Sequence, residues 1–582
     1  MRNVTCSYTC LRCLFYTLLT LDHALTIDLR SIYIKCDETA KREIRAIIHK
    51  DVNNSSIVKT ENDNPYLFKA LHGLNFKSFS LSIMRGGLNV AHEESLSQSL
   101  SSLRQLETLS IEVGYDSPGL WKALHGLNIK SLNLIGLCRG FDVKHVESLS
   151  QSLSSLTQME TLTINVMYDN PGLWKALRGL NIKSLRLSGL LDCVIMVHVE
   201  SMSQTLSSLT QMETLSIKVA VDSPVLWKAL HGLNVKSLSL SIIGGCLNVD
   251  HKESLSQSLS SLTQLETLSI LVGYDSPGLW KALHGLNIKS LNLSCLRPGF
   301  YVKHVESLSQ SLSSLTQLET LSIRVGYDSP GLWKSLHGLN IKSLSLIGMW
   351  GGLNVDHEES LSQSLSSLTQ LETLSIEVWY DSPGLWKALH GLNIKCLSLR
   401  GFSEGLCVEN VELQSQSLSS LTQLETLSIE VRYDSPGLWK ALHGLNIKSL
   451  SLEGTWGGLN VDHDESLSKS LTSLTQLETV TLYVKTYHQI ELPQSLKYLN
   501  IYCDGFLPSK VLELVDTLPT CTQKVGSNLI LCCFLEILLV ENIPLEKYTV
   551  IQQELQTRKN LTVERFQISD RKLETNFVIQ CE

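Results

Sequence analysis

The chain of 582 residues is longer than the size at which a single compact core stops growing, so it holds several domains or one elongated array. Its net charge of -8 disfavours binding to a phosphate backbone, which requires a basic stripe. Most of the 15 cysteines stand singly, and we interpret them as reduced thiols of a cytoplasmic protein, with secretion as the alternative.

Residues 1–61 are interpreted as an N-terminal cap or a degenerate repeat. Within them, residues 25–29 predict a strand and the charged stretch 37–50 predicts a helix. The cysteines of residues 6–13 could form a capping cluster or a metal site, but no second cluster of matching spacing follows. The apolar run 13–21 has a poor cleavage pattern, so we expect no signal peptide. No apolar stretch reaches the about 20 residues of a membrane span.

A repeat of 53 residues occupies the chain from about residue 62 to residue 485. The segments LETLSI and GLWKALHGL, or close variants of them, return with this step, and Phe68 takes the place of the tryptophan in the first unit. A fixed period of tens of residues indicates a solenoid of stacked units. Eight units result, with their LETLSI segments beginning at Leu106, Met159, Met212, Leu265, Leu318, Leu371, Leu424 and Leu477.

Each unit contains two strands and two helices. Alternating apolar residues predict a strand within 106–113, and leucines at 120, 124 and 127 share one face of a short helix that begins near Pro118. A second strand follows at 129–134, and a second single-faced helix at 147–156. The tryptophan of the short helix lies beside its apolar face, so we interpret it as a structural wedge between coils.

Neither the strands nor the helices can bury their apolar faces alone, so successive coils must stack around one continuous core. The sequence therefore predicts an α/β fold, a right-handed solenoid or horseshoe with a parallel β-sheet on its concave side and helices on its convex side. The regular units alone supply sixteen strands. Residues 486–582 keep leucine-rich segments without the 53-residue register, which indicates irregular C-terminal repeats and a cap.

The pattern LxxLxLxx followed by a helix, with short and long helices alternating, resembles the leucine-rich repeats of the ribonuclease-inhibitor class. That class includes the sensor arrays of NOD-like receptors. The resemblance covers about three quarters of the chain. It implies recognition of protein ligands and no catalysis within the repeats.

Most motifs of catalysis and cofactor binding are absent from the sequence. It has no GxxxxGK[ST], GxGxxG, HExxH or paired CxxC segment, so we expect no enzyme, no cofactor and no metal. Histidines recur once per unit in two series, but equivalent positions lie two strands apart, about 10 Å. Metal–nitrogen bonds are ~2 Å long, so the series are interpreted as helix-end residues copied with their unit.

The most informative positions are those at which the internal copies differ. Strand side chains alternate between the two faces of a sheet, so the residue between Ile111 and Val113 and its equivalents face away from the core. Charges and bulky side chains change there, and also in the loops at the rim of the sheet. We expect a ligand-contact surface, although free drift of surface residues after duplication would leave a similar pattern. The candidate contacts are Glu112, Asn165, Met167, Arg186, Lys218, Arg324, Trp350, Glu377, Trp379, Arg400, Arg432 and Trp456.

The leading functional hypothesis is a cytoplasmic module that recognises a protein or a pathogen-derived ligand, as an innate-immune sensor does. The alternative is a scaffold or an inhibitor that caps one endogenous partner. Nucleic acid is not expected as a ligand.

Overall fold

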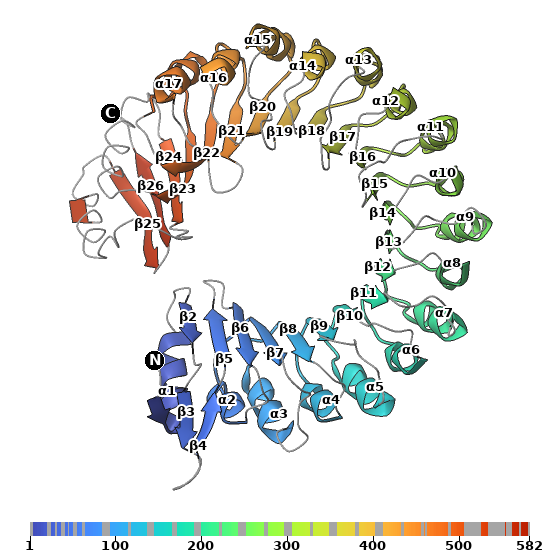
Figure 1. The fold of residues 1–582 in the computed structure, drawn as a ribbon, viewed down its shortest axis with the longest axis vertical. Coiled ribbons are helices and arrows are strands. Elements are labelled where there is room, and N and C mark those ends of the chain that lie inside the picture. The colour runs from blue at the N-terminus through green and yellow to red at the C-terminus, as the bar shows by residue number, and fades with distance from the viewer. Residues whose placement is uncertain are drawn as a thin grey trace. The chain divides into compact units, whose positions relative to one another are not determined.

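The computed structural model divides the chain into two compact units, Met1–Ile288 and Lys289–Glu582. In each unit a sheet forms the inner layer of the curve and helices form the outer layer (Figure 1). The structure describes residues 4–19, 25–28, 32–35, 41–44, 46–50, 55–60, 65–83, 93–113, 118–136, 145–165, 171–190, 199–219, 224–242, 252–272, 277–295, 305–325, 330–348, 358–378, 383–401, 411–431, 436–454, 459, 463–486, 490–505, 525–532, 553–554, 561–569 and 572–579.

In the first unit, strands and helices alternate after an irregular N-terminal part. The strands are β1 (Val4–Cys6), β2 (Leu25–Asp28), β3 (Ile32–Lys35), β4 (Lys41–Ile44), β5 (Ala46–Lys50), β6 (Ser55–Thr60), β7 (Ser78–Ile83), β8 (Thr108–Val113), β9 (Ser131–Gly136), β10 (Thr161–Asn165), β11 (Ser184–Leu190), β12 (Thr214–Val219), β13 (Ser237–Ile242) and β14 (Thr267–Val272). The helices are α1 (Tyr8–Leu19), α2 (Pro65–Ala70), α3 (Glu93–Ser102), α4 (Pro118–Leu124), α5 (Val146–Ser155), α6 (Pro171–Leu177), α7 (Val199–Ser208), α8 (Pro224–Leu230), α9 (Lys252–Ser261) and α10 (Pro277–Leu283).

The second unit continues the same alternation and ends in strands. Its strands are β15 (Ser290–Cys295), β16 (Thr320–Val325), β17 (Ser343–Gly348), β18 (Thr373–Val378), β19 (Cys396–Gly401), β20 (Thr426–Val431), β21 (Ser449–Gly454), β22 (Thr479–Thr486), β23 (Tyr498–Gly505), β24 (Val525–Cys532), β25 (Leu561–Ser569) and β26 (Lys572–Ile579). Its helices are α11 (Val305–Ser314), α12 (Pro330–Leu336), α13 (Glu358–Ser367), α14 (Pro383–Leu389), α15 (Val411–Ser420), α16 (Pro436–Leu442) and α17 (Asp464–Ser473).

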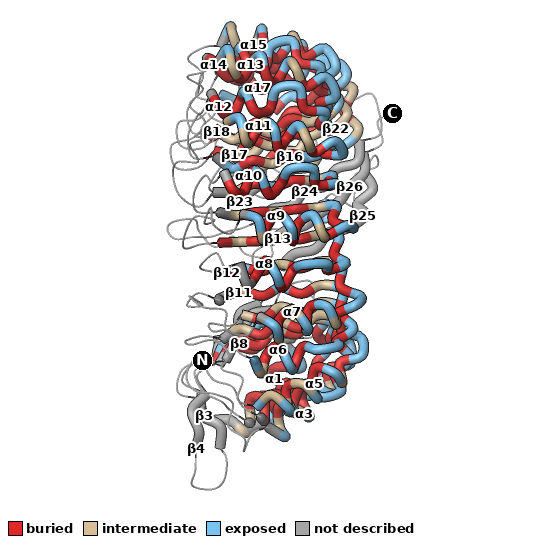
Figure 2. The backbone as a smooth tube through the Cα atoms, turned by 90° about the vertical axis from the view of Figure 1, so that its right-hand side faces the viewer, coloured by how far each residue is buried: buried red, intermediate tan, exposed pale blue. Residues whose placement is uncertain are grey.

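The strands of the repeats pair in parallel and in register with their neighbours. In β8 and β9, for example, Leu109 pairs with Leu132 and Ile111 with Leu134, and all four side chains are buried. Because burial alternates along strands such as β13 and β21, one face of the sheet packs on the helices and the other is open. Figure 2 shows buried residues recurring along the coils, with exposed residues between them. The predicted α/β coil architecture is confirmed, and the sixteen expected strands are β7 to β22.

The short helices begin at a proline and end before a glycine. In α4, Pro118 occupies the first turn, where its missing N–H group removes no helical hydrogen bond. The chain leaves the helix at Gly126, whose φ of 72° is a left-handed conformation that other residues adopt at a cost. Between them, Trp121 is completely buried. The tryptophan therefore fills the space between coils, as the sequence predicted.

Hydroxyl groups of the long helices connect each long helix to the short helix before it. The Thr205 hydroxyl donates to the carbonyl of Trp174 at 2.8 Å, and the Ser208 hydroxyl accepts from the backbone N–H of Gly179 at 2.8 Å. Serines make the same two bonds in most other units, as with Ser99 to Phe68 at 2.6 Å. These bonds supply partners to backbone groups at the helix ends, where the regular helical hydrogen bonds stop.

One long helix departs from this scheme. In α15, Gln414 stands where α5 has Leu149, and it is completely buried. Neither its amide oxygen nor its amide nitrogen has a hydrogen-bond partner, and the same holds for the hydroxyl of Ser417 one turn later. A buried polar group without a partner costs free energy, so this coil carries a local defect.

Antiparallel strands replace the parallel ladder at the outer end of each unit. In the first unit β5 pairs antiparallel with β2 and β6, and in the second unit β26 pairs antiparallel with β24 and β25. The strand expected at residues 25–29 is confirmed as β2. The helix expected over 37–50 is wrong, because its described part forms β4 and β5.

Candidate functional site

The open face of the sheet carries three rows of side chains that run across the strands. The first two rows consist mostly of small hydroxyl-bearing or amide side chains, such as the register pairs Thr214–Ser237 and Ser216–Ser239. We call them the hydroxyl rows. Such short side chains leave the backbone of the sheet accessible to a ligand and offer donors and acceptors for it.

The third row changes from strand to strand, and we call it the variable row. It lies nearest the carboxyl ends of the strands, next to the loops of the rim. In the first unit it consists of Ser82, Glu112, Ile135, Asn165, Ser188, Lys218, Ser241 and Leu271. In the second unit it consists of Ser294, Arg324, Ile347, Glu377, Arg400, Glu430, Glu453, Tyr483 and Tyr502.

Seven of the predicted contact residues lie on the described part of this face. Arg186 belongs to a hydroxyl row, and the other six belong to the variable row. The basic side chains are exposed, whereas the acidic and amide side chains are half-buried among their neighbours. The seven residues are Glu112, Asn165, Arg186, Lys218, Arg324, Glu377 and Arg400. The predicted contacts Met167, Trp350, Trp379, Arg432 and Trp456 lie outside the described residues.

In the second unit, the variable row brings three charged side chains together. Arg400 lies between two glutamates: its Nη1 is 4.0 Å from Glu377 Oε2, and its Nε donates to Glu430 Oε2. The glutamate side chains are only 18% and 15% exposed, which makes this contact stronger than one between freely solvated charges. Burial raises the pKa of Glu377, while the charges of Arg400 and Arg324 oppose that shift.

Further residues of this row escaped the sequence analysis. Glu453 follows Glu430 directly in the register, and Tyr483 and Tyr502 follow on the next two strands. The two tyrosine rings stack with centroids 4.1 Å apart and an angle of 3° between their planes. Tyr498, in the first row of β23, is 59% exposed. Glu453 and Tyr483 occupy the repeat positions of Ile135 and Glu112, so counting by 53 residues would have placed them on the open face. Tyr498 and Tyr502 lie beyond the regular units, where this count no longer applies.

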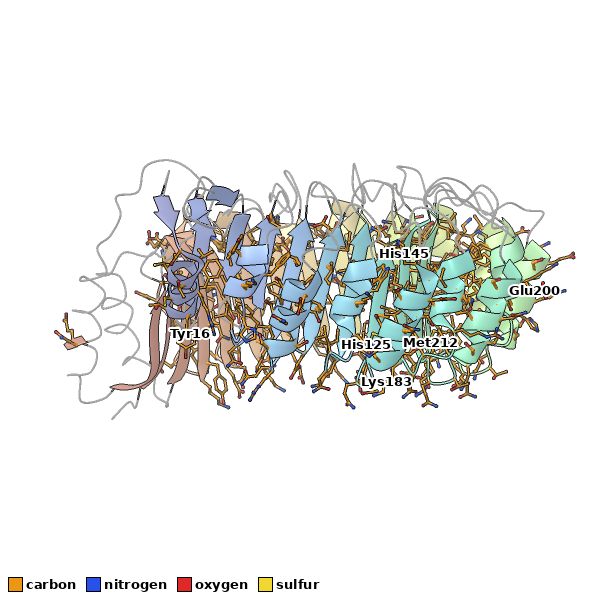
Figure 3. All side chains as sticks on the ribbon, turned by 90° about the horizontal axis from the view of Figure 1, so that it is seen from below. Tyr16, His125, His145, Lys183, Glu200 and Met212 are labelled. Carbon is orange, nitrogen blue, oxygen red and sulfur yellow. The ribbon has the colours of Figure 1, made fainter. Side chains whose placement is uncertain are left out.

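The rim at the amino ends of the strands carries a regular series of ion pairs. Glutamates and lysines alternate there from strand to strand, as with Glu160 and Lys183 at 2.8 Å and Glu213 and Lys236 at 3.0 Å. The hydrogen bond to Lys183 lowers the pKa of Glu160, and the reciprocal bond raises the pKa of Lys183. In Figure 3, Lys183 lies at the rim opposite to His145. Because these pairs are exposed, each contributes little to stability.

The described residues contain neither a metal-binding cluster nor a membrane-spanning helix. No group of three or more histidine, cysteine, aspartate or glutamate side chains there could hold a metal ion. Cys10 and Cys13 are exposed free thiols, and His145 and His463 stand at helix starts. Within the same residues, no helix has both the length and the apolar character of a membrane span.

Comparison with known proteins gives matches of fold only. No protein-family model matches the chain, and a search of curated proteins finds no relative. Among solved structures, TLR13 in a complex with ssRNA13 aligns with 18% identity and a TM-score of 0.35, over 75% of this chain and 59% of that one. A leucine-rich-repeat protein of Leptospira interrogans aligns with 15% identity and a TM-score of 0.33, over 79% of this chain and 98% of that one.

A third solved structure is the leucine-rich-repeat-containing protein LegL7 from Legionella pneumophila. It aligns with 15% identity and a TM-score of 0.27, over 71% of this chain and 94% of that one. The chain's own coils, each a parallel strand followed by a helix around leucine-rich packing, have the leucine-rich-repeat fold, as predicted.

Proposed function

We propose that this leucine-rich-repeat protein is a cytoplasmic recognition module that binds a protein or a pathogen-derived ligand through the open face of its sheet and the adjacent loops. The observation that supports this most directly is the contrast between the variable row and its surroundings. The leucine core and the hydroxyl rows barely change between units, whereas Lys218, Arg324 and Glu377 occupy equivalent positions. A rigid frame that displays different charges on successive strands suits specific binding.

A charge-reversal experiment tests this proposal. The triple variant Arg186→Glu, Lys218→Glu and Arg324→Glu changes three exposed side chains of the open face. The matched control, Lys175→Glu, Lys228→Glu and Lys281→Glu, makes the same change in charge on exposed positions of the short helices. Proteins captured by each immobilised chain are then identified by mass spectrometry, from resting cells and from cells exposed to microbial extract.

We expect the face variant to lose a partner that the wild-type chain and the control both retain. A partner captured only after microbial exposure would support a sensor. A single partner from resting cells would support the alternative, a scaffold or an inhibitor that caps one endogenous protein. If the face variant keeps every partner, the open face is not the binding surface. The net charge of -8 disfavours nucleic acid as the ligand.

A further inference from the structure

In the variable row over β18 to β21, the sign of the charge alternates on the first three strands but not on the fourth. Glu377, Arg400 and Glu430 alternate in sign on three adjacent strands, and the arginine contacts both carboxylates. The next position holds a second carboxylate, Glu453, instead of a cation. Like charges on directly paired strand residues are unfavourable, so the pair Glu430–Glu453 is a place where a cation from outside would be stabilised.

Among the described residues, Arg400 is the cation whose charge acts on Glu453. No hydrogen bond or ion pair joins its carboxylate to another residue among those that the structure describes. Burial raises its pKa, the charge of Glu430 raises it further, and Arg400 only partly compensates. Across β18 to β21 this row carries three carboxylates and one guanidinium, which is a net charge of -2.

An aromatic surface adjoins this uncompensated charge. Tyr483 pairs in register with Glu453, and Tyr502 covers one face of its ring. Because β22 lies between β21 and β23 in the sheet, the face of the Tyr483 ring opposite to Tyr502 is on the side of β21. Aromatic faces attract cations through their negative quadrupole, and Lys or Arg side chains pack on them while keeping their charge near a carboxylate.

We propose that the strip formed by Glu430, Glu453, Tyr483 and Tyr502 binds a lysine or arginine side chain of an extended basic polypeptide segment that lies on the open face of the sheet. The inference rests on the proposed function, because it names the chemistry of the partner for that same face. The charge of the strip favours a basic polypeptide over a nucleic acid or an acidic ligand. The hydroxyl rows below the strip provide donors and acceptors for the backbone of such a segment.

Fluorescence anisotropy with a labelled peptide tests this inference on the full-length chain. The probe is an eight-residue peptide of alternating Arg and Ser, compared with a peptide of alternating Glu and Ser and with a single-stranded RNA octamer. Glu453→Gln removes the charge but keeps the shape of the side chain. Glu359→Gln makes the same change at an exposed position of the second unit and serves as the matched control.

We expect the Arg–Ser peptide to bind the wild-type chain and the control equally, and Glu453→Gln to weaken its binding at least tenfold. The Glu–Ser peptide and the RNA should not compete. Equal binding to both variants, or competition by the RNA, would overturn this inference. The proposed function would survive that result if Arg186→Glu and Lys218→Glu still abolished capture of a partner, because those residues lie in the other unit.

Discussion

At the scale of single residues, Gln414 shows what a solenoid core tolerates. Its side chain fills a leucine position without a hydrogen-bond partner, and the Ser417 hydroxyl beside it is also unsatisfied. In the equivalent place of another unit, the Thr205 hydroxyl bonds to the carbonyl of Trp174. The exchange of one apolar side chain for an amide therefore coincides with two unsatisfied polar side chains in one turn of α15.

Replacing this glutamine by leucine should stabilise the protein. We expect Gln414→Leu to raise the free energy of unfolding by about 1 to 3 kcal/mol, because it removes a buried polar group that has no partner. Urea denaturation followed by circular dichroism measures the change. Gln416→Leu, on the exposed side of the same helix, should give no such gain. Equal effects of the two substitutions would mean that Gln414 finds partners in solution.

The raised pKa of Glu453 makes a prediction about pH. The folded chain holds the proton of Glu453 more tightly than the unfolded chain does. The contribution of Glu453 to the free energy of unfolding therefore increases as the pH falls through its raised pKa. Binding of a cationic peptide requires the carboxylate and should weaken over the same range. Glu430, Arg400 and Tyr483 are the charged or titratable groups around it, and the pKa of Tyr483 is raised to about 12, so that phenol stays protonated.

Anisotropy titrations between pH 7 and pH 4.5 at constant ionic strength check this expectation. The affinity of the wild-type chain for the Arg–Ser peptide should fall as the pH decreases. The residual affinity of Glu453→Gln should change much less, because its amide does not titrate. An identical pH profile for both proteins would assign the dependence to another group, with Glu377 as the next candidate because its pKa is raised too.

At the scale of elements, the spacing of apolar residues and the residues that begin and end helices made most of the fold predictable. The alternation Leu109–Ile111 predicted a strand, and Pro118 with the leucines after it predicted the short helix, because each signal is local. The prediction of a helix over residues 37–50 was wrong for the opposite reason. β4 is held by antiparallel pairing with β3, and β5 by antiparallel pairing with β2 and β6, which local charge does not reveal. Ile47 and Ile48 are nevertheless β-branched residues that favour strands.

The candidate surface was predictable only in part, for a related reason. Arg324 and Glu377 stand in regular units, where counting by 53 residues reveals their equivalence. Tyr483 and Tyr502 meet because β22 and β23 are in register, although their sequence separation is 19 residues instead of the usual 23 or 30. The stacked pair therefore depends on a change of coil length that the repeat pattern does not contain.

Helix ends provide a prediction at this scale. At Gly232, φ is 73° and an added Cβ would meet no atom within 4 Å, so a substitution there is disfavoured by the backbone conformation alone. We expect Gly232→Ala to lower the free energy of unfolding by about 1 to 2 kcal/mol, and Gly232→Asn to cost less because asparagine tolerates the left-handed region. Urea denaturation of both variants tests this. Equal losses would indicate crowding instead of backbone strain.

At the scale of the whole molecule, each coil packs mainly on its neighbours, so damage should remain local. Trp227 is fully buried in α8, and Trp227→Ala should cost about 3 to 5 kcal/mol through the cavity that it leaves. In a solenoid, stability is approximately a sum of coil and nearest-neighbour contributions. Hydrogen exchange should therefore accelerate first in β12 and β13, which flank this helix.

Hydrogen exchange measured by mass spectrometry resolves the affected segments. Lys228→Ala, at the exposed position next in sequence, should leave the protection pattern unchanged. Uniform loss of protection along both units in Trp227→Ala would mean that the array unfolds as one cooperative body. That outcome would contradict the nearest-neighbour account.

The constant spacing of the interhelical bonds has a consequence for how such a gene can change length. Gly126 to Ser155 and Gly232 to Ser261 both span 29 residues, and Glu160 to Lys183 spans 23, so most units make the same connections. If any 53 consecutive codons within the regular part are deleted, the two flanking segments are joined at equivalent positions of the repeat. The spacing that these connections require is then preserved. Recombination between copies can thus delete or add a pair of strands while the chain remains able to fold. The same event changes which charged residues of the variable row are neighbours.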